Sequence, residues 1–109
     1  DLSLQRMKGL TLYNLGRYKE SLELYDQIIE ASPRIEPYVI DVAALEGKGD
    51  ALRALNRNQE ALEAYNEAIE LAPSSSAAWH GKGEAERALG QVGNAGMSLL
   101  MADKLGYKK

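Results

Sequence analysis

An all-α fold of three helix–turn–helix pairs is predicted for this chain of 109 residues. The first reason is an internal repeat, because the residues of one stretch recur along the chain at constant spacings. One set recurs 40 residues later, Gly9, Tyr25 and Pro33 as Gly49, Tyr65 and Pro73. Another set recurs 34 residues later, Gly49, Leu55, Ala61, Ala68 and Leu71 as Gly83, Leu89, Ala95, Ala102 and Leu105. The second reason is that apolar residues within each repeat are spaced as on one face of a helix.

The composition is that of an ordinary folded protein, with 45% hydrophobic and 27% charged residues. The net charge of −3 argues against a general nucleic-acid or anionic-membrane surface, which needs clustered Lys and Arg. Because the sequence has no Cys, disulfides and thiolate metal sites are excluded. No apolar run reaches the length of a membrane span, and no signal-peptide pattern opens the chain. We therefore expect a cytoplasmic protein of one domain, residues 1–109, that needs no cofactor.

The first repeat is expected at about residues 2–35. Its first helix carries the leucines Leu4, Leu12 and Leu15. That helix is expected to end at Gly16, since glycine is the usual residue for a left-handed helix stop. The second helix presents an apolar face of Leu22, Tyr25 and Ile29. Ser32-Pro33 should end it, because the residue before a proline disfavours the helical conformation.

The second repeat is expected at about residues 42–75, and an insertion at residues 36–41 precedes it. Pro37 within this insertion suits the first position of a helix. The residues that would then share one helix face are Tyr38, Val42, Leu45, Gly49 and Leu52. We predict a single extended helix from about residue 37 to residue 55; a turn over the insertion is the alternative.

The third repeat, at about residues 76–109, departs from the other two. Serines 74–76 offer caps for its first helix, and its second helix should begin near Gly93. At positions that should be core, Glu86 replaces Leu12 and Leu52, Gly96 replaces Leu22 and Leu62, and Asp103 replaces Ile29 and Ile69. Apolar residues replace polar ones on the outward face, namely Met97, Leu100 and Met101. These three residues either contact a second copy or another protein, or the last helix is rotated so that they are buried and Asp103 stays outside.

Glycine recurs inside the first helix of each repeat, as Gly9, Gly49 and Gly83. A glycine within a helix costs about 1 kcal/mol relative to alanine. The repeated acceptance of this cost at one place predicts that a neighbouring helix approaches too closely for a side chain.

The recurring residues resemble the signature of the tetratricopeptide repeat, in which a large residue, Gly, Ala, an aromatic residue, Ala and Pro recur over about 34 residues. The second repeat matches with Leu45, Gly49, Leu52, Ala61, Tyr65, Ala68 and Pro73. The third matches with Trp79, Gly83, Gly90, Ala95 and Ala102, with Leu99 in the aromatic position. The first matches with Gly9, Leu12, Gly16, Tyr18, Tyr25 and Pro33, with Ser21 and Ile28 in place of alanines.

This resemblance implies a short right-handed α-solenoid of three stacked pairs, without catalytic activity. It also implies a concave groove along the first helices that binds a peptide or part of another protein. The implied groove residues are Arg6, Leu10, Tyr13 and Asn14, then Glu46, Asp50, Arg53 and Ala54, then His80, Glu84, Arg87 and Ala88. One subgroup of the family grips the carboxylates of chaperone tails with Lys, Asn and Arg, and those places are taken here by Leu10, Asp50, Ala77 and Gly81. Since Asp50 and Glu84 would repel a carboxylate, we do not expect such a clamp.

Two other features are explained more simply by structure than by a metal site or a phosphate-binding loop. His80 is the only histidine and provides no standard metal set without Cys, so we interpret it as a solvated groove residue. The segments 47–49 and 81–83, both Gly-Lys-Gly, lack the spacing of a phosphate-binding loop and lie in predicted helices, where they favour helix packing.

The charges of the groove leave two interpretations open. Acidic and basic residues alternate there, with Asp50–Arg53 and Glu84–Arg87 three positions apart. They either bind a polar or partly basic segment or merely keep the helices soluble, since such pairs stabilise a helix by only a few tenths of a kcal/mol. We expect a non-catalytic interaction module for a protein or peptide, with self-association through the last helix as the alternative. No nucleic acid or membrane partner is expected.

Overall fold

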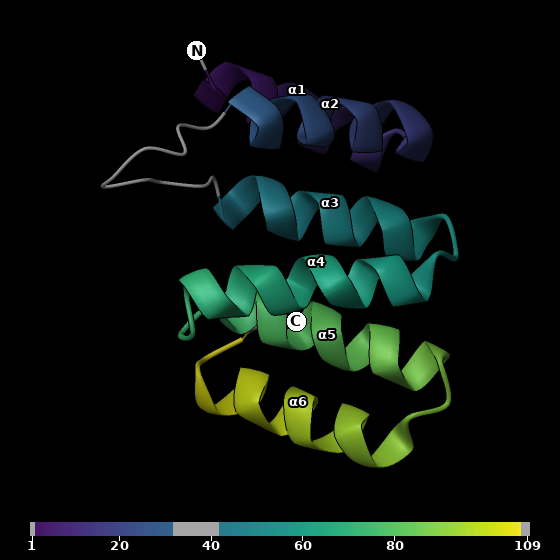
Figure 1. The fold of residues 1–109 in the computed structure, drawn as a ribbon, viewed down its shortest axis with the longest axis vertical. Helices are drawn as coiled ribbons and strands as arrows, with labels where there is room; N and C mark the ends of the chain where they lie inside the picture. Colours follow the sequence, from purple (N-terminus) through teal and green to yellow (C-terminus); the bar gives the residue numbers. More distant parts are fainter. Residues whose placement is uncertain (1, 32–41, 108–109) are drawn as a thin grey trace.

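The computed structural model describes residues 2–31 and 42–107, which form six α-helices in antiparallel pairs. The pairs are α1 (Leu2–Asn14) with α2 (Tyr18–Ala31), α3 (Val42–Ala54) with α4 (Asn58–Leu71), and α5 (Ser76–Ala88) with α6 (Val92–Lys104). Figure 1 shows the helices stacked in sequence order, with α1 and α2 at one end and α6 at the other. The predicted all-α fold of three helix pairs is confirmed.

The turns within the pairs share one backbone geometry. Gly16, Asn56 and Gly90, which occupy equivalent positions, have φ angles of 79°, 65° and 83°. Glycine adopts this left-handed conformation without steric cost, and asparagine tolerates it better than most residues. Each turn closes with two backbone hydrogen bonds, as in Gly90 N–H to Arg87 O at 3.0 Å and Gln91 N–H to Glu86 O at 2.8 Å. The predicted stop at Gly16 is confirmed.

The helix predicted to extend from residue 37 is described only from Val42 onward. Residues 36–41, which would decide between an extended helix and a turn, lie outside the described residues, as does the predicted helix end at Ser32-Pro33. Within the described part, Leu45, Gly49 and Leu52 are buried on one face of α3, as the sequence predicts.

Each of the first two pairs buries a tyrosine between two glycines of different helices. The ring of Tyr65 lies against Gly49 of its own pair, where an added Cβ would be 2.7 Å from Tyr65 Cε1. The same ring lies against Gly81 of the next pair, where an added Cβ would be 2.3 Å from Cε1 and Cζ. Tyr25 contacts Gly9 and Gly47 in the same way. The close approach predicted at Gly9, Gly49 and Gly83 is confirmed. Tyrosine rings cause it at the first two, and the side chain of Leu99, whose Cγ would be 2.7 Å from an added Cβ, causes it at Gly83.

The third pair keeps the helix orientation of the other two. Ala95, Ser98 and Ala102 are its buried residues in α6, at the positions of Ala61, Ala64 and Ala68 in α4. Glu86 is only 4% exposed, so it does occupy a core position, and Ser98 Oγ donates a hydrogen bond to its carboxylate at 2.6 Å. A buried carboxylate needs such a partner, since desolvation without one is costly.

The burial of Met97, Leu100 and Met101 that a rotated last helix would bring is wrong, because these residues are 75%, 54% and 39% exposed. Gly96 and Asp103 are exposed as well, so they do not occupy core positions, and Asp103 lies outside as that explanation expected. Burial of the three alanine-type positions fixes α6 in the usual orientation, and the apolar residues then face outward. Leu4 in α1 and Leu15 in the turn after it are also exposed. Within residues 2–31 and 42–107, no helix is both long and apolar enough to cross a membrane.

The ring-to-glycine contact predicts opposite effects for two glycine-to-alanine changes. Gly81→Ala should lower the free energy of unfolding by about 1–3 kcal/mol, because its Cβ overlaps the Tyr65 ring. Gly96→Ala, where nothing lies within 4 Å of the added Cβ, should raise it by about 0.5–1 kcal/mol through helix propensity. Urea unfolding of both variants checks this. Equal changes in the free energy of unfolding would show that the contact between residue 81 and the Tyr65 ring accommodates a methyl group.

Candidate functional site on the face of the first helices

The predicted groove residues come from equivalent positions of α1, α3 and α5, and α3 contacts both other helices. Those that are exposed are Leu10, Asn14, Ala54, Arg87 and Ala88. Those that are partly buried are Arg6, Tyr13, Glu46, Asp50, Arg53, His80 and Glu84. Electrostatic interactions link the rows, since Asp50 acts on Tyr13 of α1 and His80 of α5 acts on Asp50. The structure thus brings the central members of the predicted set together.

Asp50 lies at the centre of this face in a hydrogen-bonded network. Its carboxylate accepts a hydrogen bond from the Tyr65 hydroxyl, and Arg53 Nε donates to that hydroxyl at 3.3 Å. Arg53 also forms an ion pair with Asp50, at 3.5 Å. Burial raises the pKa of Asp50, although the Tyr65 hydrogen bond and the Arg53 charge oppose the rise. The sequence indicated Tyr65 only as the aromatic residue of the second repeat, and the structure adds its hydroxyl to the candidate site.

Two further acids of the face are already engaged within the chain. Glu46 accepts a hydrogen bond from Ser75 Oγ, which comes from the turn before α5. Burial raises the pKa of Glu46, with the Ser75 hydrogen bond acting against it. Glu84 pairs with Arg87 one turn later in α5, as its spacing predicts. The face therefore presents charges that are held in place before any partner arrives.

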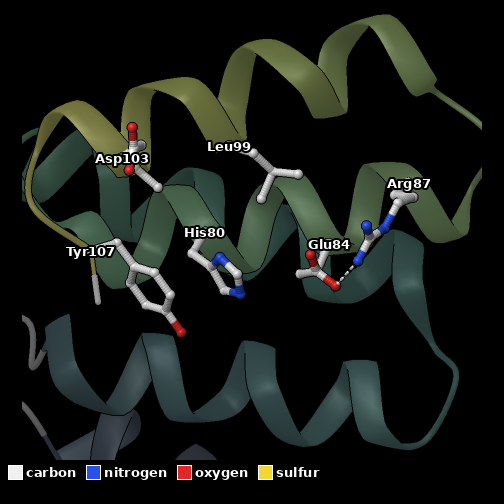
Figure 2. A pocket seen from close by; sticks show the side chains of 7 residues that line it. His80, Glu84, Arg87, Leu99, Asp103 and Tyr107 are labelled. Carbon is white, nitrogen blue, oxygen red and sulfur yellow. Dashed lines mark hydrogen bonds and ion pairs between the residues drawn. The ribbon is translucent and has the colours of Figure 1, made fainter. Parts of the chain in front are cut away.

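A cavity of about 510 Å³ opens at the α5 and α6 end of the face (Figure 2). Its lining combines groove and α6 residues, namely His80, Glu84, Arg87, Leu99, Ala102, Asp103 and Tyr107. The rings of His80 and Tyr107 stack with centroids 4.0 Å apart and planes 8° apart. Tyr107 was not predicted as a site residue; it lies 34 positions after Pro73, so it replaces the proline that closes the other repeats.

Among the described residues, no group of three His, Cys, Asp or Glu side chains could hold a metal ion. Gly47 and Gly81 of the two Gly-Lys-Gly segments lie inside α3 and α5 against tyrosine rings, so helix packing explains both segments as predicted. The arrangement can supply hydrogen bonds, charges and apolar contacts to a bound chain.

The raised pKa of Asp50 predicts how stability depends on pH. The folded state binds the proton of Asp50 more tightly than the unfolded state does. Ionisation of Asp50 therefore lowers the free energy of unfolding as the pH rises above about 4, the ordinary pKa of an aspartate side chain. Asp50→Asn keeps an acceptor for Tyr65 and has no proton to lose. The unfolding free energy of the wild type minus that of the variant should therefore fall between about pH 4 and pH 7. Thermal or urea unfolding over this range measures it, with Asp103→Asn as an exposed control; a flat or rising difference contradicts the assignment.

Comparisons with solved structures show the same fold over almost the whole chain. PcrH in complex with the chaperone-binding region of PopB matches with a TM-score of 0.86 and 16% identity, over 95% of this chain and 79% of that one. The second repeat domain of Spaghetti (RPAP3), bound to the HSP90 peptide SRMEEVD, matches with 0.80 and 22%, over 93% and 88%. MamA from Desulfovibrio magneticus RS-1 matches with 0.81 and 22%, over 97% of this chain and 56% of that one.

These identities establish a common fold, and this chain spans little more than half of the MamA chain. A search of curated proteins found no match. A family model provides the assignment, because the tetratricopeptide repeat model matches residues 2–74, which is more than half of the chain. The predicted resemblance is thereby confirmed, and the chain belongs to the tetratricopeptide repeat family.

Proposed function

We propose that this chain is a non-catalytic module that binds a peptide or a segment of another protein along the face of α1, α3 and α5. The observation that carries the proposal is the continuous row of equivalent positions on these three helices. It runs from exposed Leu10 on α1 past the Asp50 network on α3 to the cavity beside His80 on α5. Exposed side chains there flank charges with fixed positions, which gives a bound segment both apolar contact and selectivity.

Acidic side chains on this face favour a polar or basic segment over an acidic tail. Glu46, Asp50 and Glu84 follow one another along α3 and α5, and their negative charges make a further negative charge nearby unfavourable. The places where chaperone-tail binders of the family carry cationic or amide groups hold Leu10, Asp50, Ala77 and Gly81. The structures of PcrH and RPAP3 contain a protein region and a peptide respectively, which supports a peptide-binding role for the fold.

Selection from a random peptide library, displayed on phage, tests the proposal. Selected peptides should be enriched in Lys or Arg, and they should shift the amide resonances of α1, α3 and α5. Glu46→Gln combined with Glu84→Gln should weaken their binding by about tenfold or more, which is about 1.4 kcal/mol. Asp50 is kept because its carboxylate accepts from Tyr65.

The matched control replaces two exposed glutamates of α4, Glu63→Gln and Glu67→Gln, and should leave binding unchanged. Resonance shifts confined to α4 or α6, or equal effects of the two double variants, would reject this face as the site. The peptide SRMEEVD is a second probe. It should not bind at about 100 µM, and binding at that concentration would contradict the exclusion of acidic tails.

A second candidate function is self-association or contact with another protein through the outward surface of α6. Its specific observation is a cavity of about 340 Å³ lined by Met97, Met101 and Trp79, among others. The equivalent cavity of the second pair is lined by Glu60, Glu63 and Glu67. Met97 and Met101 thus stand where the second pair has Glu63 and Glu67, while Lys82, Glu86 and Asn94 line the same cavity. Exposed apolar side chains in place of acidic ones are typical of a contact surface.

Met97→Glu combined with Met101→Glu tests this second candidate. Both side chains are exposed, so the fold should be unaffected. If the outward surface of α6 carries self-association, light scattering at about 100 µM will show a smaller mass for the variant than for the wild type. A wild-type chain that is strictly monomeric at this concentration would contradict self-association, and peptide binding to the first helices would be unaffected by that result.

A further inference from the structure

The second and third helix pairs each dock on the preceding pair through three small residues of their first helix. These are Ala44, Gly47 and Ala51 in α3, and Ala78, Gly81 and Ala85 in α5. The four alanines are completely buried, and the two glycines lie against the rings of Tyr25 and Tyr65. The two junctions within the chain therefore use one register, in which a first helix inserts beside the preceding aromatic residue.

The same three positions in α1 hold larger residues that are exposed. Leu4 and Met7 are 67% and 65% exposed, and Thr11 is exposed as well. All three line an open cavity of about 660 Å³ on the outer side of the first pair. A surface that contacts only water usually carries polar residues, whereas Leu4 and Met7 provide apolar area for contact with another molecule.

The opposite end of the stack also has an open cavity. Leu99 occupies the position of Tyr25 and Tyr65 and borders the cavity of about 510 Å³ together with Ala102 (Figure 2). At the inner junction, the backbone of α5 comes so close to Tyr65 that only glycine fits. Beside Leu99 that space is open, so side chains can enter it.

We propose that α1 of one copy docks in the cavity between α5 and α6 of a second copy, so that two chains associate head to tail. Leu4 and Met7 of the first copy then fill the cavity beside Leu99 and Ala102 of the other. At the junctions within the chain, the helix backbone fills the space beside the tyrosine ring. In the proposed contact the side chains of Leu4 and Met7 fill the corresponding space, so the docked α1 lies farther from Leu99 than α5 lies from Tyr65. The contact continues the register in which the pairs of one chain already stack.

Charges at the two ends agree with this register. At the inner junction, a positive charge on His80 of α5 favours the carboxylate of Asp50 on α3. The equivalent positions at the ends are Arg6 on α1 and Glu84 on α5. Head-to-tail docking thus brings Arg6 and Glu84, which already pairs with Arg87 at the cavity, to the places that His80 and Asp50 occupy. Asp103 adds a second acid at the cavity. Both surfaces belong to this chain, so a second copy satisfies the shape and the charge together.

Because the contact joins two different surfaces, each assembly keeps one unoccupied surface of each kind. Each added copy exposes a new α1 surface at one end and a new cavity at the other, so association continues unless the rotation closes a ring. The average mass should therefore rise steadily with concentration and should not stop at the dimer. Analytical ultracentrifugation of the 109-residue chain up to about 100 µM measures this.

Two variants block one end each. Met7→Glu places a charge on the exposed surface of α1, and Leu99→Tyr fills the cavity with the residue that the other two pairs carry against glycine. Each variant alone should be monomeric, with an unchanged circular dichroism spectrum. Asp103→Lys, on an exposed position of α6, is a second way to block the cavity end if Leu99→Tyr fails to fold.

Mixing the two blocked variants gives the decisive result. The mixture should form a heterodimer and nothing larger, because one free end of each kind remains. Met97→Glu, a matched change on the outward surface of α6, should associate like the wild type. A mixture that stays monomeric, or loss of association in Met97→Glu but not in Met7→Glu, overturns the head-to-tail contact; the latter result would support the α6 surface instead.

Discussion

The tyrosine ring between two glycines is the contact on which the rest of the structure depends. Tyr65 meets Gly49 of its own pair and Gly81 of the next, at distances that exclude a Cβ at either place. One ring therefore sets both the spacing within a pair and the spacing between pairs. Tyr25 does the same one pair earlier. Because a ring is rigid and close-packed interiors tolerate little change in volume, successive first helices are held in one register.

This register is also what creates the candidate binding face. Once Tyr65 fixes α3 and α5, its hydroxyl lies at the first-helix face and donates to Asp50, while Arg53 donates to the hydroxyl. The same residue is thus core at its ring and part of the site at its oxygen. In the proposed binding mode, a partner that contacts Asp50 would therefore also affect the junction between the second and third pairs through Tyr65.

Much of the fold was predictable from the sequence, because the spacings of 40 and 34 residues place six helices and their turns without any knowledge of the packing. The site was predictable only in part. The positions of Asp50 and Glu84 follow from helix register, whereas the Tyr65 hydroxyl and the stack of Tyr107 on His80 depend on contacts between distant residues. The orientation of α6 was undecided in the sequence, because a pattern with Gly96 and Asp103 at core positions fits more than one rotation. Burial of Ala95, Ser98 and Ala102 decides it.

The central claim is that the Tyr65 ring couples neighbouring pairs through Gly81, and a double-mutant cycle measures that coupling directly. The cycle combines Tyr65→Leu with Gly81→Ala and follows the free energy of unfolding in urea. Since the smaller leucine leaves room for the added methyl group, the double variant should be more stable than the sum of the two single effects by about 1 kcal/mol or more. Additive effects, with a coupling near zero, would contradict the account.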